Sequence, residues 1–381
     1  MTFDDLIKTA AARGASDIHL RAGHAPTVRI HGELHNWGGT VAALTAGHMD
    51  AIADRLLPPL HKERLQTKLE VDVAWQAAGV GRIRASVFRQ RGTTAVSMRL
   101  IPDTIPGLEQ LGLPASVVKL GEESRGLVLV TGVTGSGKST TLAALIDLIN
   151  RTRPLHVITI EDPIEFVHKD VRAAVTQREI GMDTPSYASG LRAALRQDPD
   201  VILIGEMRDP ETIETALVAA ETGHLVFSTL HTLDAPETIN RIVSAFPPHQ
   251  QGQIRNQLSK VLRASVSQRL LSRADGQGRA LAAEVLIATP YIKGCIEDVE
   301  KTGLIPDAIV GGVSQYGMQS FDQSILRLCK DGAVSVEEAE RNVTNVEEFR
   351  MRLRGITSGS ATELEAAPAT ALGSRLQRLG N

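Results

Sequence analysis

Four short apolar runs lie along the middle of the chain, and each is followed by a longer segment of mixed polarity. They cover residues 127–131, 157–160, 201–204 and 225–228. Runs of this length are typical of strands that are buried on both faces of a parallel sheet. After the first run, apolar residues recur at the i, i+3, i+4, i+7 spacing of a helix face, at Leu142, Leu145, Ile146 and Ile149. The alternation predicts a parallel α/β core. From 250 to 355 the pattern predicts mostly helix.

The first hundred residues follow a different pattern. A helix-like opening precedes segments in which apolar and polar residues alternate with a period of two, at 18–20, 27–30 and 82–88. A proline-punctuated stretch around 101–114 then indicates a linker. We therefore expect an α+β domain over 1–102, a linker over 103–115, an α/β domain with C-terminal helices over 116–355, and a flexible tail over 356–381.

A glycine-rich segment joins the first apolar run to the helix pattern behind it. Residues 132–139 read GVTGSGKS and match the phosphate-loop pattern G-x-x-x-x-G-K-[ST] in its strand–loop–helix context. Its glycines let backbone N–H groups point at a phosphate, and the helix N-terminus adds partial positive charge. Lys138 is expected to reach the β- and γ-phosphates, and the Ser139 hydroxyl to ligate Mg²⁺. The predicted nucleotide-binding residues of this segment are Gly132, Thr134, Gly135, Ser136, Gly137, Lys138, Ser139 and Thr140.

Acidic residues follow the second and third apolar runs. Glu161, Asp162 and Glu165 come just past the second run, around a turn-forming proline. Ligands bind beyond the carboxyl ends of strands in open α/β sheets, so a carboxylate here can polarise or hold an attacking water. The usual pattern places an aspartate directly after such a run, whereas here Gly205 follows the third run and Glu206 takes the place of the acid that senses Mg²⁺ or water. A single acid after a strand can equally solvate a loop, and only its pairing with the phosphate loop favours a functional role.

Two histidines bracket the fourth apolar run, His224 before it and His231 after it. At the carboxyl end of a strand in this fold, His231 or its neighbour Thr229 is placed to sense the γ-phosphate. A lone histidine is as often a structural residue whose hydrogen bonds are satisfied within the protein. Both interpretations stay open from the sequence.

Composition restricts the class of protein. With 381 residues, 42% hydrophobic and 22% charged, the chain is an ordinary globular protein long enough for two domains. No apolar run reaches the roughly 18 residues of a membrane span, and the start lacks the basic and apolar regions of a signal peptide. Two cysteines without a CxxC pair argue against a disulfide framework or a cysteine zinc site and fit a reducing cytoplasm. A net charge of −3 and 3% aromatic residues argue against a nucleic-acid surface.

Together, these segments resemble the secretion and type IV pilus ATPases. The matching blocks are the phosphate loop, TIEDPIE at 159–165, LRQDPDVILIGEMRD at 195–209 and TGHLVFSTLHT at 222–232, with further matches at 15–20, 81–84 and 317–323. Several long motifs in the family's order, from Ala15 to about Phe349, make the resemblance specific. It implies a ring-shaped homohexamer in which an N-terminal PAS-like α+β domain precedes a RecA-like P-loop ATPase core with a helical C-terminal region.

The resemblance also implies roles for individual residues. Lys138 and Ser139 would hold ATP and Mg²⁺, and Glu206 would be the second-strand acid at the metal. Glu165 would be the best candidate for the catalytic acid, with Glu161 as the alternative. His224 and His231 belong to the family's histidine block, in which His231 is a catalytic candidate. The remaining implied residues are four arginines, namely Arg82, Arg84, Arg192 and Arg196. The first two arginines match residues that reach the nucleotide of a neighbouring subunit. Arg192 and Arg196 lie four apart and are expected on one helix face. They would be either inter-subunit contacts or part of a solvated, salt-bridged face.

The implied function is a cytoplasmic, Mg²⁺-dependent ATPase that acts at the inner face of the cytoplasmic membrane and drives pilus retraction and twitching motility. Its partners would be further copies of the chain and an inner-membrane pilus platform protein, without stable nucleic-acid contacts. Assembly-type relatives add a long N-terminal region and a four-cysteine zinc insert, and the lack of both here favours retraction. The alternatives are an assembly-type or accessory ATPase and a RecA-like nucleic-acid translocase.

One segment departs from the retraction branch of the family. Residues 291–298 keep the isoleucines and the terminal acid of that branch's AIRNLIRE block but little else. They are expected to form a short amphipathic helix, with Ile292, Cys295 and Ile296 on one face. The departure leaves the ATPase interpretation intact and keeps the direction of the motor open.

Overall fold

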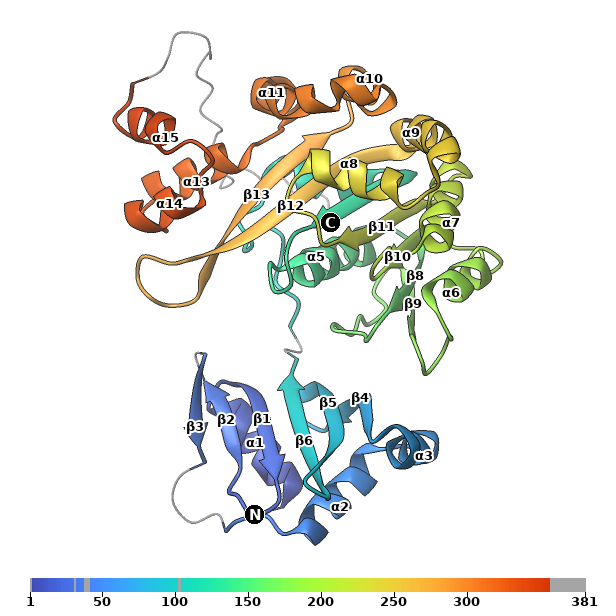
Figure 1. Cartoon of the computed structure of the whole chain (residues 1–381), viewed down its shortest axis with the longest axis vertical. Coiled ribbons are helices and arrows are strands. Elements are labelled where there is room, and N and C mark those ends of the chain that lie inside the picture. The colour runs from blue at the N-terminus through green and yellow to red at the C-terminus, as the bar shows by residue number, and fades with distance from the viewer. Residues whose placement is uncertain (1, 31, 38–41, 102–103, 357–381) are drawn as a thin grey trace, which may run out of the picture. The chain divides into compact units, whose positions relative to one another are not determined.

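The computed structural model describes residues 2–30, 32–37, 42–101 and 104–356 (Figure 1). The chain divides into two compact units. The first consists of the residues up to Ile105 together with Pro163–Val167, and the second of Pro106–Asp162 together with the chain from His168 onward. Of the predicted tail, only the first residue lies within the described part of the chain.

The first unit is built on a six-stranded sheet with the order β3-β2-β1-β6-β5-β4. All neighbouring strands in it are antiparallel. The strands are β1 (Ala15–Arg21), β2 (Thr27–Ile30), β3 (Glu33–Asn36), β4 (Glu70–Ala77), β5 (Gly81–Gln90) and β6 (Thr93–Leu100). The three segments with alternating polarity fall inside β1, β2 and β5, so their prediction as strands is confirmed.

Three helices pack on one face of this sheet, namely α1 (Phe3–Ala12), α2 (Ala46–Leu56) and α3 (Pro59–Lys68). On β5, Ile83, Ala85 and Val87 are buried in the core that these helices share with the sheet. Arg82 and Arg84 alternate with them, because successive side chains of a strand point to opposite faces. Both arginines therefore lie on the face of the sheet that the three helices leave uncovered.

The second unit is built on a seven-stranded sheet with the order β13-β12-β7-β11-β10-β8-β9. Every neighbouring pair is parallel except β12 and β13. The strands are β7 (Gly126–Thr131), β8 (His156–Glu161), β9 (Ala174–Glu179), β10 (Val201–Ile204), β11 (Leu225–Leu230), β12 (Leu262–Ser272) and β13 (Arg279–Ile287). The four apolar runs correspond to β7, β8, β10 and β11, which confirms the predicted parallel core.

Helices connect and flank these strands (Figure 1). They are α4 (Ala115–Lys119), α5 (Lys138–Thr152), α6 (Tyr187–Ala194), α7 (Pro210–Glu221), α8 (Ala235–Ser244), α9 (Pro248–Val261), α10 (Pro290–Glu297), α11 (Ile305–Gly311), α12 (Val313–Tyr316), α13 (Phe321–Lys330), α14 (Val336–Asn342) and α15 (Val346–Leu353), with 3₁₀ turns η1 (Leu120–Glu122) and η2 (Val299–Leu304). The main apolar core joins α6 to α11 with the parallel strands. A second core packs β12 and β13 against α13, α14 and α15.

The C-terminal third differs from the prediction of mostly helix over 250–355. β12 and β13 form an antiparallel hairpin with nine register pairs. β13 reads RALAAEVLI, and its alanines favour helix intrinsically. Burial of Ala282, Val285 and Leu286 in the sheet overrides that propensity. The prediction of mostly helix therefore missed the two strands of this range, β12 and β13.

The amphipathic helix predicted over 291–298 is confirmed as α10. Ile292, Cys295 and Ile296 are buried on it, and Tyr291 is 59% exposed. The Thr289 side chain caps its first turn by accepting a hydrogen bond from the Ile292 N–H. Both isoleucines that match the family block are thus core positions.

Candidate active site

The parallel strands of the second unit end at one edge of the sheet, and several predicted site residues follow those ends. β7 and β11 end in register with each other, and β10 ends close to the end of β8. The phosphate loop after β7, Glu161 at the end of β8, Glu206 after β10 and His231 after β11 therefore share this edge. Open α/β sheets bind their ligands at this carboxyl edge.

The phosphate loop lies between β7 and α5, which begins at Lys138. Gly132, Gly135 and Gly137 have φ angles of 137°, 80° and 92°, which residues with side chains rarely adopt. A Cβ atom on Gly132 would also stand 2.5 Å from the carbonyl oxygen of Gln268. The local conformation thus requires glycine where the phosphate-loop pattern has it.

The polar atoms of the loop fit a phosphate group. The Lys138 ammonium is buried and donates to the carbonyl oxygens of Gly132 and Val133 at 2.8 and 3.0 Å. The hydroxyl of Ser136 is buried inside the loop and has no hydrogen-bond partner in the described part of the chain. A buried polar group of this kind calls for a partner, and a phosphate oxygen would supply one. A cation and a hydroxyl donor are therefore held where the motif requires them.

The remaining residues of the motif line the mouth of the loop. Thr134 and Ser139 are exposed, and Thr140 is half-buried in the first turn of α5. Among the described residues, no group of three or more His, Cys, Asp or Glu side chains could hold a metal ion. Mg²⁺ at phosphate sites is usually bound by one or two protein groups together with phosphate oxygens. An exposed hydroxyl at Ser139 fits that mode of binding.

The β12–β13 hairpin, which the sequence pattern did not reveal, supports the loop. Gln268 on β12 is buried and donates to Thr141 Oγ1 on α5 at 2.6 Å. Arg279, at the start of β13, donates to the carbonyl oxygen of Gly135 at the tip of the loop at 3.3 Å. Neither residue belongs to one of the motifs. A glutamine within a segment of small and apolar residues is the signal that could have found Gln268.

The two acids around the turn after β8 occupy different positions. Glu161 closes β8, and its Oε1 accepts hydrogen bonds from Thr159 Oγ1 at 2.6 Å and from Gln177 Nε2 at 3.2 Å. Glu165 is half-buried on Pro163–Val167, the segment that groups with the first unit. Of these two acids, Glu161 is therefore the one that belongs to the second unit, at the edge that carries the phosphate loop. The catalytic role of Glu165 stays a prediction.

Glu206 forms a charged cluster with Arg208 and His231. Its Oε1 lies 2.6 Å from Arg208 Nε and 3.3 Å from His231 Nε2. Burial raises the pKa of Glu206, but the hydrogen bond and charge of Arg208 and the neighbouring His231 outweigh burial, so the net pKa is below its ordinary value. Glu206 is therefore ionised at neutral pH. Two predicted site residues are brought together here, with Arg208 as a third that sequence reasoning missed.

Gly205, which separates β10 from Glu206, is explained by close packing. A Cβ atom at this position would stand 3.0 Å from the hydroxyl oxygen of Tyr187. The pKa of Tyr187 is raised, first by burial and then by the nearby carboxylates of Asp162 and Glu206. The departure from the usual aspartate directly after the strand thus makes room for a protonated tyrosine beside the acid.

His224 lies at the opposite edge of the sheet. Its carbonyl oxygen accepts from the N–H of Gly126, the first residue of β7, at 3.0 Å, and its Nδ1 lies 2.9 Å from the Ala219 carbonyl oxygen. The phosphate loop follows the other end of β7, so this chain does not bring His224 to its own loop. Thr229 is buried and donates to the Gly205 carbonyl oxygen at 2.6 Å, which engages its hydroxyl in the sheet.

The predicted inter-subunit arginines fall into two groups. Arg82 and Arg84 are half-buried on the first unit, and Arg192 forms an ion pair with Glu211 on α7. Arg196 donates to the Arg192 carbonyl oxygen at 2.9 Å. α6 ends at Ala194, so the expectation that residues 192 and 196 share one helix face is wrong. Asp198 has a φ of 53° and precedes Pro199, so the chain cannot stay helical through this stretch.

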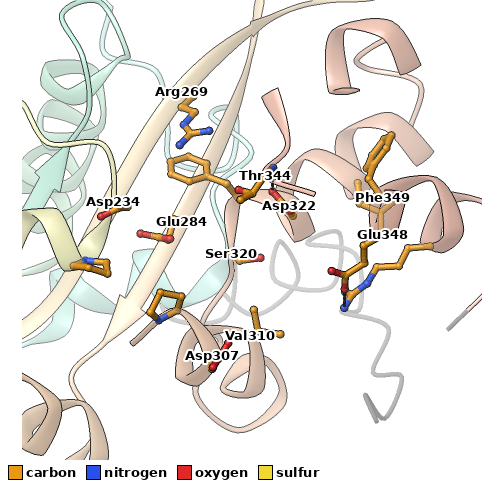
Figure 2. A pocket seen from close by; sticks show the side chains of 15 residues that line it. Asp234, Arg269, Glu284, Asp307, Val310, Ser320, Asp322, Thr344, Glu348 and Phe349 are labelled. Carbon is orange, nitrogen blue, oxygen red and sulfur yellow. Dashed lines mark hydrogen bonds and ion pairs between the residues drawn. The ribbon is translucent and has the colours of Figure 1, made fainter. Parts of the chain in front are cut away.

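A separate cavity of about 440 Å³ lies in the second unit (Figure 2). Side chains from β12, β13 and helices α11, α13 and α15 line it, and no phosphate-loop residue does. In its wall, the Glu284 carboxylate accepts from the Ala235 N–H at 2.8 Å, and burial raises the pKa of Glu284 to about 7. The Arg269 guanidinium stacks 3.9 Å above the centre of the Phe321 ring.

Within the described ranges, no helix has the length and apolar character needed to cross a bilayer.

Comparison with known protein sequences gives extensive matches. The family model described as "Type II/IV secretion system protein" matches residues 1–304. A twitching motility protein of Neisseria gonorrhoeae is 42% identical over 342 residues, which cover 90% of each chain. The type IV pilus retraction ATPase PilT of Pseudomonas aeruginosa is 41% identical over 349 residues, which cover 92% of this chain and 100% of the relative.

A solved structure matches over the same extent. The crystal structure of the pilus retraction motor PilT with bound ADP has a TM-score of 0.84 and 46% sequence identity, and the match covers 91% of this chain and 98% of that chain. The predicted fold class, an N-terminal α+β domain followed by a RecA-like P-loop core, is thereby confirmed.

Proposed function

Because this chain belongs to the type II/IV secretion system protein family, we propose that it is a hexameric, Mg²⁺-dependent motor that powers the retraction of type IV pili and hence twitching motility. It is an ATPase of that family, with a complete phosphate loop in the expected place. The observation that carries the pilus assignment is its 41% identity to PilT along the whole length of that relative.

In the proposed complex, the phosphate loop holds the β- and γ-phosphates of ATP. The buried Lys138 ammonium supplies the positive charge that stabilises the transferred phosphoryl group. The Ser136 hydroxyl and the backbone N–H groups of the loop add donors. Mg²⁺, bound through Ser139 and Glu206, would neutralise phosphate charge.

The acidic residues and His231 have separate proposed roles. With its lowered pKa, Glu206 is ionised but is a weak base, so it is suited to orient groups rather than to take a proton. Glu165, or Glu161 in its place, is then the proposed base that orients and deprotonates the attacking water. His231, 3.3 Å from Glu206, is the proposed sensor of the γ-phosphate.

Completion of each site by a neighbouring subunit is part of the proposal. Arg82 and Arg84 lie on the uncovered face of the first sheet and would reach the nucleotide of the next subunit in a ring. Arg192 and Arg196 are proposed as weaker inter-subunit contacts. A contact between His224 and nucleotide would also have to come from another subunit, since His224 lies at the edge away from its own loop.

We place the motor at the inner face of the cytoplasmic membrane, where a platform protein of the pilus machinery would receive its force. A strain that lacks the protein tests this directly. Long, static pili and loss of twitching are expected, with rescue by the wild-type chain and no rescue by Lys138→Ala.

The second candidate is an assembly-type or accessory ATPase, and the divergent segment around α10 favours it. Absence of pili in the deletion strain would show assembly. Normal retraction with an active paralogue would show an accessory role. Purified protein without ATP turnover would contradict both candidates as motors.

A further inference from the structure

The candidate catalytic acids lie at the start of and within one connection between β8 and β9. It leaves β8 at Glu161, carries Glu165 on the Pro163–Val167 segment, and rejoins the second unit at His168. Hydrolysis requires that the acid is held in position, because a small misplacement of a catalytic group can cost a large part of the rate. Contacts that hold Glu161 and His168, the residues at the two ends of this connection, are therefore expected.

The Gln177 side chain is hydrogen-bonded to both ends. Gln177 lies on β9 opposite Thr159 of β8. Its Nε2 donates to Glu161 Oε1 at 3.2 Å, and its Oε1 accepts from the His168 backbone N–H at 2.8 Å. Glu161 and His168 are the residues on either side of residues 162–167. The Gln177 amide thus closes a loop around the segment that carries Glu165.

The orientation of the amide is fixed by its partners. An ionised carboxylate can only accept hydrogen bonds, and a backbone N–H can only donate one. The amide nitrogen must therefore face Glu161 and the oxygen must face His168. Thr159 Oγ1 donates to the same Glu161 oxygen at 2.6 Å, so two donors set the rotation of that carboxylate.

The surrounding fold does not depend on these two bonds. β8 and β9 pair through six register positions of their backbones. The stretch after His168 is anchored separately by Asn150, which donates to the Lys169 carbonyl oxygen at 2.8 Å and accepts from the Val171 N–H at 3.0 Å. What Gln177 adds is the position of Glu161 and of the loop that follows it.

We propose that Gln177 is a positioning residue for ATP hydrolysis, which orients Glu161 and closes the loop that carries Glu165. The inference rests on the proposed function as an ATPase, and it assigns Gln177 no contact with the nucleotide. Loss of its side chain should therefore lower kcat and leave nucleotide affinity unchanged.

The test compares ATP turnover and binding of a fluorescent ATP analogue in full-length protein. Gln177→Met keeps the length of the side chain and removes both hydrogen bonds. We expect kcat to fall by about 10- to 100-fold, with the dissociation constant within about twofold. Gln257→Met is the matched control, because Gln257 also donates to a glutamate, Glu221, at 3.0 Å, but between α9 and α7. The control should keep both parameters within about twofold.

A double-mutant cycle on kcat distinguishes positioning of Glu161 from a purely structural role of Gln177, because only positioning couples the two substitutions. Because Gln177 acts in part through Glu161, the kcat loss of Gln177→Met should be clearly smaller in a Glu161→Gln background. Full additivity of the two losses would overturn the proposal. Equal kcat of Gln177→Met and wild type would overturn it as well, as would a loss confined to nucleotide affinity.

A second variant guards against failure to fold. Gln177→Glu is nearly isosteric and keeps the acceptor for His168, but it sets a carboxylate against Glu161. It should lose kcat as the methionine variant does, and wild-type turnover in a folded Gln177→Glu protein would contradict the proposal. Absence of turnover in the wild-type protein would instead contradict the proposed function, so the two failures are distinguishable.

Discussion

Replacement of Glu284 by glutamine should stabilise the protein at alkaline pH and leave its stability unchanged at acidic pH. Glu284 is 8% exposed, in the wall of the cavity between the hairpin and the C-terminal helices (Figure 2). Its Oε1 accepts from the Ala235 N–H at 2.8 Å and from Ser267 Oγ at 3.4 Å. An amide oxygen in the same place can accept both bonds. The substitution therefore changes the charge and little else.

The expected magnitude follows from the pKa. Burial raises the pKa of Glu284 from 4.5 to about 7, and the charge of Asp234 adds to the rise. A carboxyl group with a raised pKa binds its proton more tightly in the folded than in the unfolded chain. Its ionisation therefore opposes folding increasingly between about pH 4.5 and 7, and the full penalty is present above that range. At about 1.4 kcal/mol per pKa unit, the penalty amounts to about 3 kcal/mol.

Urea unfolding at fixed protein concentration measures the effect. At about pH 8, Glu284→Gln should be more stable than wild type by about 1–3 kcal/mol, and near pH 4.5 or below the two should agree. Glu214→Gln, exposed on α7, is the matched control and should change stability by less than about 0.5 kcal/mol at both pH values. Equal or lower stability of Glu284→Gln at about pH 8 would refute the reasoning that the ionised carboxylate is buried at a cost.

Four further outcomes are expected. Lys138→Ala should abolish ATP turnover while circular dichroism stays that of the folded protein, because the lost ammonium serves the phosphates; near-normal turnover would contradict the nucleotide site. Glu206→Gln and Glu165→Gln should each keep ATP binding but lower turnover by about 10²-fold or more, and a fully active Glu165→Gln would transfer the base role to Glu161. Arg84→Ala should lose the rise of specific activity with protein concentration that a composite site requires, and a fully active, concentration-independent variant would exclude such a site. Lys293→Ala on α10 should keep turnover within about twofold but lose twitching, and persistent twitching would make α10 purely structural.

The core of the second unit could be predicted because its signal is local. β7, β8, β10 and β11 are buried on both faces, so each appears as a continuous apolar run. β12 and β13 gave no such signal. Ser267 and Gln268 are buried on β12 although they are polar, because Ser267 accepts from Thr131 on the phosphate-loop strand and Gln268 donates to Thr141 on the helix that follows the loop. Their environment is set by segments over a hundred residues away, which no window of sequence contains.

The same distinction separates the site residues that were predicted from those that were missed. The phosphate loop, Glu161 and Glu206 stand in motifs whose spacing is fixed by one strand and its turn. Gln268 and Gln177 act across strands, and only the pairing of β12 with β7 and of β9 with β8 shows them. A motif search finds the groups that touch a ligand more readily than the groups that hold them in place.

The divergent segment around α10 concerns the direction of force and not the chemistry of ATP hydrolysis. On α10 the retained positions Ile292 and Ile296 are buried, so they preserve the packing of the core. Of the changed positions, Tyr291 is 59% exposed and Lys293 is half-buried. Glu297 accepts a hydrogen bond from Ser259 Oγ on α9 at 2.8 Å, so its replacement would also remove a contact between helices. It is therefore not included in the test of the exposed face of α10. The buried Cys295 replaces one apolar residue of the core by another, whereas the change at the exposed Tyr291 alters what a partner meets on this helix. These changes on α10 do not affect the edge of the sheet that carries the phosphate loop and Lys138.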